Sequence, residues 1–234
     1  MVGAQFTVQD LVGELNQLER KHAPPAVFIA GRPGLLKRRP RISIVGTRDP
    51  SRTGEDLAEA VATAVVDSGG VVVSGLAKGI DTIALRTAIE KKGDAIAVIG
   101  TPLSKTYPAE NAKLQAELMR RHLVVSQFAE GTPTGRHSFP IRNRTMALLS
   151  DATVIIEAGE SSGTQHQGWE AIRLGRPLFI PTTLLAEGIT WAASMLTYGA
   201  FTYSNAGELQ AFFDERMPTT LDLPAVVERA LALA

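Results

Sequence analysis

Short apolar runs rich in β-branched residues alternate along the chain with longer segments of helical spacing. Each run is too short for a helix, and most are bounded by Gly, Pro, Ser or Asp, so the runs predict strands. They lie at residues 42–45, 71–73, 95–99, 123–125, 153–156 and 178–180. Between them, apolar positions recur at helical intervals, as at Leu57, Val61 and Val65. Strand–helix–strand units repeated with short connections predict an α/β fold, with a mostly parallel sheet covered by helices on both faces.

The length of 234 residues favours one large domain with short extensions. We expect an N-terminal extension over residues 1–39, a main domain over 40–216 and a C-terminal helical tail over 217–234. Within these parts the pattern predicts a helix at 8–20, a strand at 26–30, and helices at 206–216 and 225–233.

The composition, 44% hydrophobic and 21% charged, excludes a disordered or fibrous chain. The sequence has no cysteine, which excludes disulfides, a thiolate nucleophile and cysteine-ligated zinc. Its apolar runs are far shorter than a membrane span, and the first ten residues lack the pattern of a signal peptide, so we expect a cytoplasmic protein that does not contact membranes. The four histidines are scattered without metal-site spacing, and we expect neither a metal nor a cofactor.

Charge is segregated along the chain although the formal net charge is zero. Residues 20–48 contain eight basic residues and no acid, and residues 131–150 contain three arginines and no acid. Acids gather instead at 55–59 and 208–215. These runs are either solvated loop charges or, if the fold brings them together, a basic patch suited to a polyanion.

The turn after the first strand of the main domain contains groups suited to a phosphate. Ligands of parallel sheets bind at the carboxyl ends of the strands, where helix N-termini present free amides. Gly46 would allow close backbone approach, Thr47 offers a hydroxyl and Arg48 offers a planar fork of donors. An ordinary strand-to-helix turn explains this tripeptide equally well.

The second turn combines Ser74 and Gly75 with Lys78 and Gly79. Two glycines around small residues suit a backbone nest for an anion. Asp81 is expected to cap the helix that follows.

The turn after the strand at 153–156 contains Ser162, Gly163 and Thr164 at a predicted helix start. Such a turn is a good phosphate cradle and an equally good N-cap.

Pro140 can open a helix, which would place Arg142 and Arg144 in its first turns, where the helix dipole disfavours cations. This placement suggests an anionic partner or an internal acid such as Glu157. Two solvated arginines on a helix surface remain the alternative.

Several short motifs follow one another in a fixed order. They are Gly46-Thr47-Arg48, Ser74-Gly75-Leu76-Ala77, Gly79-Ile80-Asp81, Tyr107-Pro108 with Asn111, Phe139-Pro140 with Arg142-Asn143-Arg144, Leu149-Ser150-Asp151, Glu157-Ala158 with Ser162-Gly163-Thr164, and Gly175-Arg176-Pro177. Through them, residues 24–181 resemble the DprA/Smf family of DNA-processing proteins.

The resemblance implies an extended Rossmann-like fold, single-stranded DNA held by its phosphates in a basic pocket, a homodimer, and transfer of that DNA to the RecA recombinase in recombination or DNA uptake. It implies Arg48 as the leading phosphate contact, with Arg142 and Arg144 beside it or structural. Binding through phosphates without base readout should depend weakly on sequence and steeply on salt.

Two other functions remain open. The chain also resembles the LOG-type phosphoribohydrolases, but Gln167 stands where their general base is a glutamate, and Glu170 lies about one helical turn further on. The third function is a sensor of a small nucleotide-like ligand, because a phosphate cradle does not reveal the length of the polymer. Tyr107, Trp169 and Trp191 could stack on bases, although Trp169 suits an apolar core better.

Overall fold

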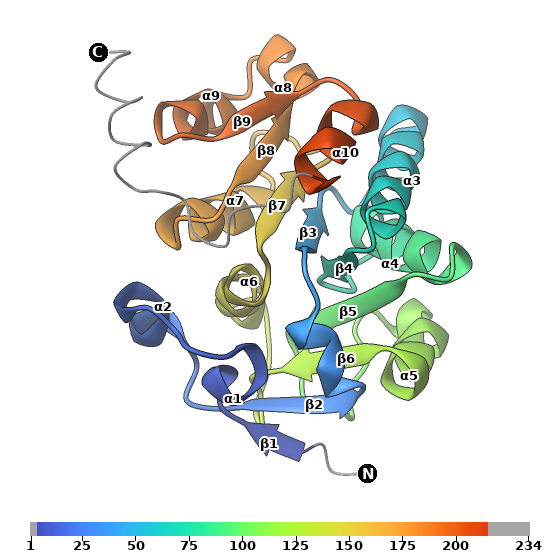
Figure 1. Cartoon of the computed structure of the whole chain (residues 1–234), viewed down its shortest axis with the longest axis vertical. Coiled ribbons are helices and arrows are strands. Elements are labelled where there is room, and N and C mark those ends of the chain that lie inside the picture. The colour runs from blue at the N-terminus through green and yellow to red at the C-terminus, as the bar shows by residue number, and fades with distance from the viewer. Residues whose placement is uncertain (1–3, 215–234) are drawn as a thin grey trace.

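The computed structural model describes residues 4–214 and is built around one nine-stranded sheet (Figure 1). The strand order is β1-β2-β6-β5-β4-β3-β7-β8-β9. The strands are β1 (Ala4–Phe6), β2 (Val27–Gly31), β3 (Arg41–Val45), β4 (Val71–Ser74), β5 (Asp94–Ile99), β6 (Leu123–Ser126), β7 (Ala152–Ile155), β8 (Leu178–Pro181) and β9 (Phe201–Tyr203). From β6 to β9 all neighbours are parallel, whereas β2 pairs antiparallel with β6, and β1 antiparallel with β2.

Helices cover both faces of this sheet, so the predicted Rossmann-like α/β class is confirmed. The helices are α1 (Val8–Val12), α2 (Gln17–His22), α3 (Arg52–Asp67), α4 (Ile80–Glu90), α5 (Ala112–Arg121), α6 (Ser138–Leu149), α7 (Thr164–Arg173), α8 (Thr182–Ala186), α9 (Thr190–Thr197) and α10 (Ala206–Asp214), with 3₁₀ turns at Pro33–Lys37 and Ala109–Asn111. One core lies between the sheet and α1, α6, α7, α8 and α9, and a second lies between the sheet and α3, α4, α5 and α10.

The two cores explain why the strands are continuously apolar. Val71 and Val73 pack into the first core and Val72 into the second, so every position of β4 before Ser74 is buried. A sheet buried on both faces has no solvent face to accommodate polar residues. Hence the six predicted strands match β3 to β8 within one or two residues at each end.

The N-terminal prediction needs one correction. The segment 8–20 forms two short helices, not one, because Asn16 and Glu19 make a reciprocal capping box that begins α2. The strand predicted at 26–30 is β2, and it extends the main sheet beside β6.

The other differences lie near the ends of the chain. The three-residue strands β1 and β9 were not predicted. Helix α10 covers the described part of the segment 206–216. The predicted tail at 217–234, with its helix at 225–233, lies outside the described residues, and the proposed domain boundaries remain predictions. Within residues 4–214, no helix has the length and apolar character needed to span a bilayer.

Candidate functional site

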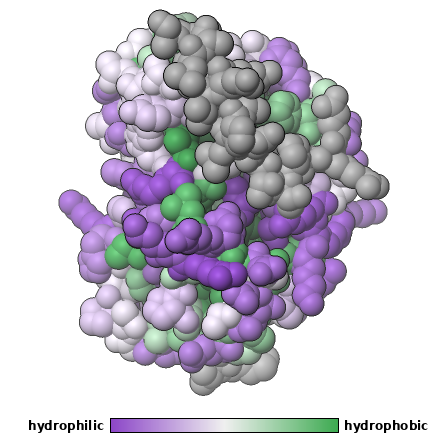
Figure 2. Space-filling model, turned by 60° about the vertical axis from the view of Figure 1, so that its left-hand side comes forward, coloured by the Kyte–Doolittle hydropathy of each residue, from purple (hydrophilic) through white to green (hydrophobic). Residues whose placement is uncertain are grey.

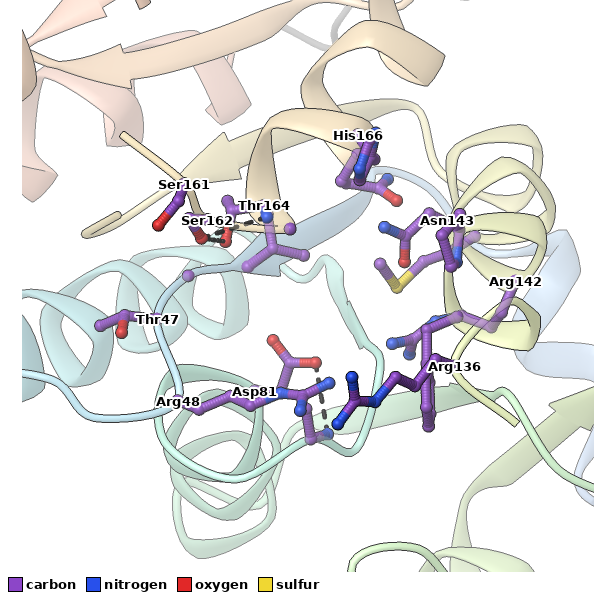
Figure 3. A pocket seen from close by; sticks show the side chains of 18 of the residues that line it. Thr47, Arg48, Asp81, Arg136, Arg142, Asn143, Ser161, Ser162, Thr164 and His166 are labelled. Carbon is purple, nitrogen blue, oxygen red and sulfur yellow. Dashed lines mark hydrogen bonds between the residues drawn. The ribbon is translucent and has the colours of Figure 1, made fainter. Parts of the chain in front are cut away.

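A hollow of about 780 Å³ opens at the carboxyl edge of the parallel strands (Figure 3). The turn after β3, the loop between β4 and α4, the first half of α6 and the loop between β7 and α7 supply its walls. We call this hollow the rim pocket. It lies where ligands of open parallel sheets bind, as expected from the order of the elements.

Arg48 lies at the rim pocket with an exposed guanidinium. Its Cζ is 5.6 Å from the centroid of the Phe139 ring, which is within range of a cation–π contact. The Phe139 ring in turn lies 5.3 Å from that of Tyr107, whose side chain is 48% exposed. The two rings therefore orient the guanidinium while leaving its donors open to the pocket.

Gly46 is needed for internal packing. A Cβ at this position would lie 2.6 Å from Cγ1 of Ile80 and 2.9 Å from the carbonyl oxygen of Glu157. The neighbouring amide of Thr47 donates to that same carbonyl at 2.7 Å. The close approach predicted for a ligand at Gly46 is thus made by the protein itself, and it ties the turn after β3 to the loop after β7.

The loop between β4 and α4 already holds an anion, the carboxylate of Asp81. This carboxylate accepts from the amides of Gly75 at 3.1 Å and Ala77 at 3.3 Å. The prediction that Asp81 caps α4 is wrong, because Gly79 occupies the N-cap position without a side-chain hydrogen bond. The hydroxyl of Ser74 is buried and donates to the carbonyl oxygen of Ile44.

Arg142 lies buried in the second turn of α6, because the helix begins at Ser138 and not at Pro140. Its Nη1 donates to the carbonyl oxygen of Val98 at 2.7 Å, and a Cβ on Gly75 would lie only 1.7 Å from Nη1. Burial lowers the pKa of Arg142 and raises the pKa of Asp81, and the attraction between the two charges opposes both shifts. The internal acid is therefore Asp81.

Glu157, which the sequence offered as one example of an internal acid near the arginines of α6, instead accepts from the amide and the hydroxyl of Ser51. Ser51 is the N-cap residue of α3, and its hydroxyl also accepts from the amide of Gly54. Glu157 thus fixes the start of α3.

Arg144 and Lys78 do not line the rim pocket. Arg144 Nε donates to Glu170 at 3.2 Å, and Glu170 also accepts from Arg173 at 2.6 Å.

Figure 2 brings the side of α2, α6 and α7 forward and shows hydrophilic side chains across its middle. Lys78 lines a second hollow of about 300 Å³, together with Arg48 and the carboxylates of Asp49, Glu55 and Glu110.

The start of α7 lines the rim pocket with Ser162, Gly163 and Thr164, and their contact with a phosphate stays a prediction. The hydroxyl of Ser162 accepts from the amide of Thr164 at 3.2 Å and donates to its hydroxyl at 2.9 Å. Gly163 is the N-cap residue and has no side chain, so the first amide of the helix, that of Thr164, is capped by Ser162 instead. The turn therefore caps the helix and also contributes to the pocket wall.

The lining carries excess positive charge, with three arginines against one carboxylate. The arginines are Arg48, Arg136 and Arg142, and the carboxylate is Asp81. Arg136 was missed as a site residue, although the acid-free run 131–150 was a signal for it. His166, Asn143 and Gln167 also line the pocket and were not among the predicted phosphate contacts, although Asn143 belongs to the motif that contains Arg142 and Gln167 was considered at the general-base position.

Of the three aromatic residues considered for stacking, Tyr107 lines the pocket. Trp191 is buried and donates to the carbonyl oxygen of Gly159, and Trp169 packs edge-on against Tyr198. Residues 4–214 contain no cluster of three or more potential metal ligands.

A family profile and curated relatives match most of the chain. The profile described as DNA recombination-mediator protein A matches residues 9–214. The DNA processing protein DprA of Bacillus subtilis is 31% identical over 85% of this chain and 68% of its own length. The DprA protein of Streptococcus pneumoniae is 39% identical over 77% of this chain and 64% of its own length. Protein Smf of Escherichia coli is 32% identical over 67% of this chain, which spans 42% of that protein.

Solved structures give the same result for the fold. The crystal structure of DprA from S. pneumoniae aligns with a TM-score of 0.77 and 31% identity, covering 90% of this chain and 74% of that one. DNA processing protein A from Helicobacter pylori, whose structure concerns its single-stranded DNA binding mode, aligns with a TM-score of 0.73 and 24% identity. The alignment covers 90% of this chain and 97% of that one.

Proposed function

The chain belongs to the DNA recombination-mediator protein A family, and from this premise we propose that the rim pocket binds the phosphates of single-stranded DNA. The observation that carries the proposal is the exposed guanidinium of Arg48 at a pocket with net positive lining. A guanidinium in this position can bind a phosphate through two parallel hydrogen bonds.

In this proposal the predicted residues have distinct roles. Arg48 and Arg136 are exposed and contact the phosphates, while Thr47 and the turn of Ser162, Gly163 and Thr164 add hydroxyl and amide donors. Arg142 is buried beneath Gly75 and shapes the pocket without reaching the strand.

An unpaired strand suits the pocket better than a duplex. The exposed ring of Tyr107 lies beside Phe139 at the pocket, and a base can stack on such a ring when it is not paired. The match to the H. pylori protein, whose structure concerns single-stranded DNA, points to the same class of ligand.

The arrangement of carboxylates supports binding rather than glycosidic hydrolysis. Glu170 is the acid nearest in sequence to the general-base position, but it pairs with Arg144 and Arg173 outside the pocket lining. Asp81, which does line the pocket, is bound by two backbone amides beside Arg142. Neither carboxylate is placed as a free general base.

The family membership also leads us to propose a homodimer that hands its strand to RecA. Sedimentation equilibrium tests the dimer, and RecA filament assembly on strands first coated with this protein tests the transfer. A monomer, or assembly no faster than without the protein, would contradict these two parts.

Fluorescence anisotropy with a labelled strand of about 12 thymidines tests the binding itself. We expect Arg48→Ala to lose at least about tenfold in affinity, since a charge-assisted bidentate pair is lost. Arg120→Ala is the matched control, because Arg120 is an exposed arginine at the end of α5, at the opposite edge of the sheet. Equal affinities of the two variants, or equal affinity for duplex, would refute the proposal. Binding of mononucleotides without binding of strands would favour the sensor.

A further inference from the structure

The wall of the rim pocket contains a buried amide with an unused acceptor. Gln167 lies on α7 and is 1% exposed. Its Nε2 donates to the hydroxyl of Thr153 at 3.4 Å, whereas its Oε1 is buried and has no hydrogen-bond partner among residues 4–214. A buried carbonyl oxygen without a donor costs free energy, so this atom marks a place where a ligand donor would be favourable.

A second amide lies in the same wall. Asn143 lies on α6, next to α7, and is 9% exposed. Its side chain makes no hydrogen bond with other described residues. Figure 3 shows Asn143 and His166 on the side of the pocket away from Thr47. Two helices that contact each other thus each bring an amide with spare hydrogen-bonding capacity to the lining of the pocket.

The unsatisfied oxygen of Gln167 is poorly suited to a phosphate. A phosphodiester offers only acceptors, and the unsatisfied Oε1 of Gln167 is itself an acceptor. The side chains of Val45 and Met146 also line the pocket and offer apolar contact. Apolar contact combined with amide groups is the usual environment for a nucleobase, whose edge carries N–H donors and whose faces are apolar.

We propose that Asn143 and Gln167 form a subsite for the hydrogen-bonding edge of one nucleobase, in which Oε1 of Gln167 accepts from an exocyclic amino group. The subsite rests on the proposed function, since phosphates at Arg48 hold the strand next to it. Phosphate contacts supply most of the affinity, and the subsite adds a preference at one position of the strand. Cytosine and adenine carry such an amino group, whereas thymine and uracil carry a carbonyl there.

The sharpest probe is a pair of labelled strands of deoxycytidine and deoxyuridine, each of about 12 nucleotides. Cytosine and uracil share ring size and charge. Cytosine carries an amino group at C4 beside an acceptor at N3, whereas uracil carries a carbonyl at C4 beside an N–H at N3. We expect the cytidine strand to bind about fivefold to tenfold more tightly than the uridine strand. This is the range expected when one strand forms a buried hydrogen bond and the other places a mismatched group at the same position.

Two variants test the assignment. Gln167→Met keeps the side-chain length without hydrogen-bonding groups, and we expect it to bind both strands equally. Gln165→Met, on the same helix and outside the pocket lining, should keep the preference. The comparison of strands on the unaltered protein tests the subsite even if Gln167→Met does not fold.

The outcomes separate the two proposals. Equal affinity of the unaltered protein for both strands overturns the subsite and leaves phosphate binding by Arg48 intact. No binding of either strand overturns the proposed function. If deoxycytidine monophosphate binds as tightly as the strand, and more tightly than deoxyuridine monophosphate, the subsite is supported. The base that it binds would then belong to a free nucleotide and not to a DNA strand.

Discussion

At the scale of single residues, the site divides its arginines into two classes that look alike in sequence. Arg48 is exposed and stacks on Phe139, whereas Arg142 is buried and faces Asp81 from a different helix. The motif containing Arg142 was recognisable, but its burial depends on contacts with Val98 and Gly75 that are distant in sequence. The sequence therefore identified both arginines, but it predicted a single role, phosphate contact, only for Arg48. For Arg142 it left open whether the side chain contacts phosphate or is structural.

The buried pair leads to a prediction about stability. Asp81→Asn removes the negative charge that attracts Arg142 and weakens the hydrogen bonds from the amides of Gly75 and Ala77, and it should lower the free energy of unfolding by about 1 to 3 kcal/mol. Arg142→Met should cost a similar amount, and the double variant should lose clearly less than the sum. Urea unfolding measures all three, with Asp67→Asn as a control on an exposed acid. Additive losses would show that the two charges do not interact.

His122 should make stability depend on pH. Burial lowers the pKa of His122, so the folded protein favours the neutral ring. The unfolded chain then binds more protons, and the free energy of unfolding should fall as the pH drops below the ordinary histidine value of about 6.5. The charged groups around the ring are Asp94, Arg32, Glu117 and Arg121. Between about pH 7.5 and about 5.5, the free energy of unfolding of the unaltered protein should fall more steeply than that of His122→Gln. Parallel plots of the free energy of unfolding against pH for the two proteins would contradict this.

At the scale of elements, prediction was accurate where burial alone decides the structure. Strands β3 to β8 are buried on both faces, and their composition shows it. The loops between β4 and α4 and before α6 were less predictable, because side chains from other elements determine their shape. Asp81 bonds to the first of these loops where a helix cap was expected, and α6 begins two residues before Pro140.

Gly75 tests how tightly the loop after β4 is packed. A methyl group there would overlap the guanidinium of Arg142, so Gly75→Ala should lower the free energy of unfolding by about 1 to 3 kcal/mol and weaken DNA binding. Gly34→Ala is the matched control, since a Cβ at Gly34 meets no atom within 4 Å. Similar unfolding curves for the two variants would show that Arg142 can move aside.

At the scale of the whole molecule, a net charge of zero means that attraction to DNA depends on local charge. The fold brings two acid-free runs to one pocket, with Arg48 from the first and Arg136 from the second. The alternation of strands and helices predicted this edge of the sheet as the ligand site. It could not place Asn143 and Gln167 together in the pocket wall, because their positions there depend on how α6 packs on α7.

The slope of the predicted salt dependence measures how many phosphates the protein contacts. Each contact with a single strand contributes about 0.7 to the slope of log affinity against log salt concentration. Arg48→Ala and Arg136→Ala should each reduce that slope by about 0.7, while Arg120→Ala leaves it unchanged. A titration from low to moderate salt measures the slopes, and an unchanged slope in Arg48→Ala would place the phosphates elsewhere.

The carboxylate of Asp81 has one further consequence. By accepting hydrogen bonds from the amides of Gly75 and Ala77, it holds the loop after β4 in place before any ligand binds. A strand arriving at this edge therefore meets a surface that is already ordered, and little conformational entropy is lost on association. Capture should then proceed in a single kinetic phase whose rate rises in proportion to DNA concentration, without the plateau that a slow rearrangement of the protein would produce.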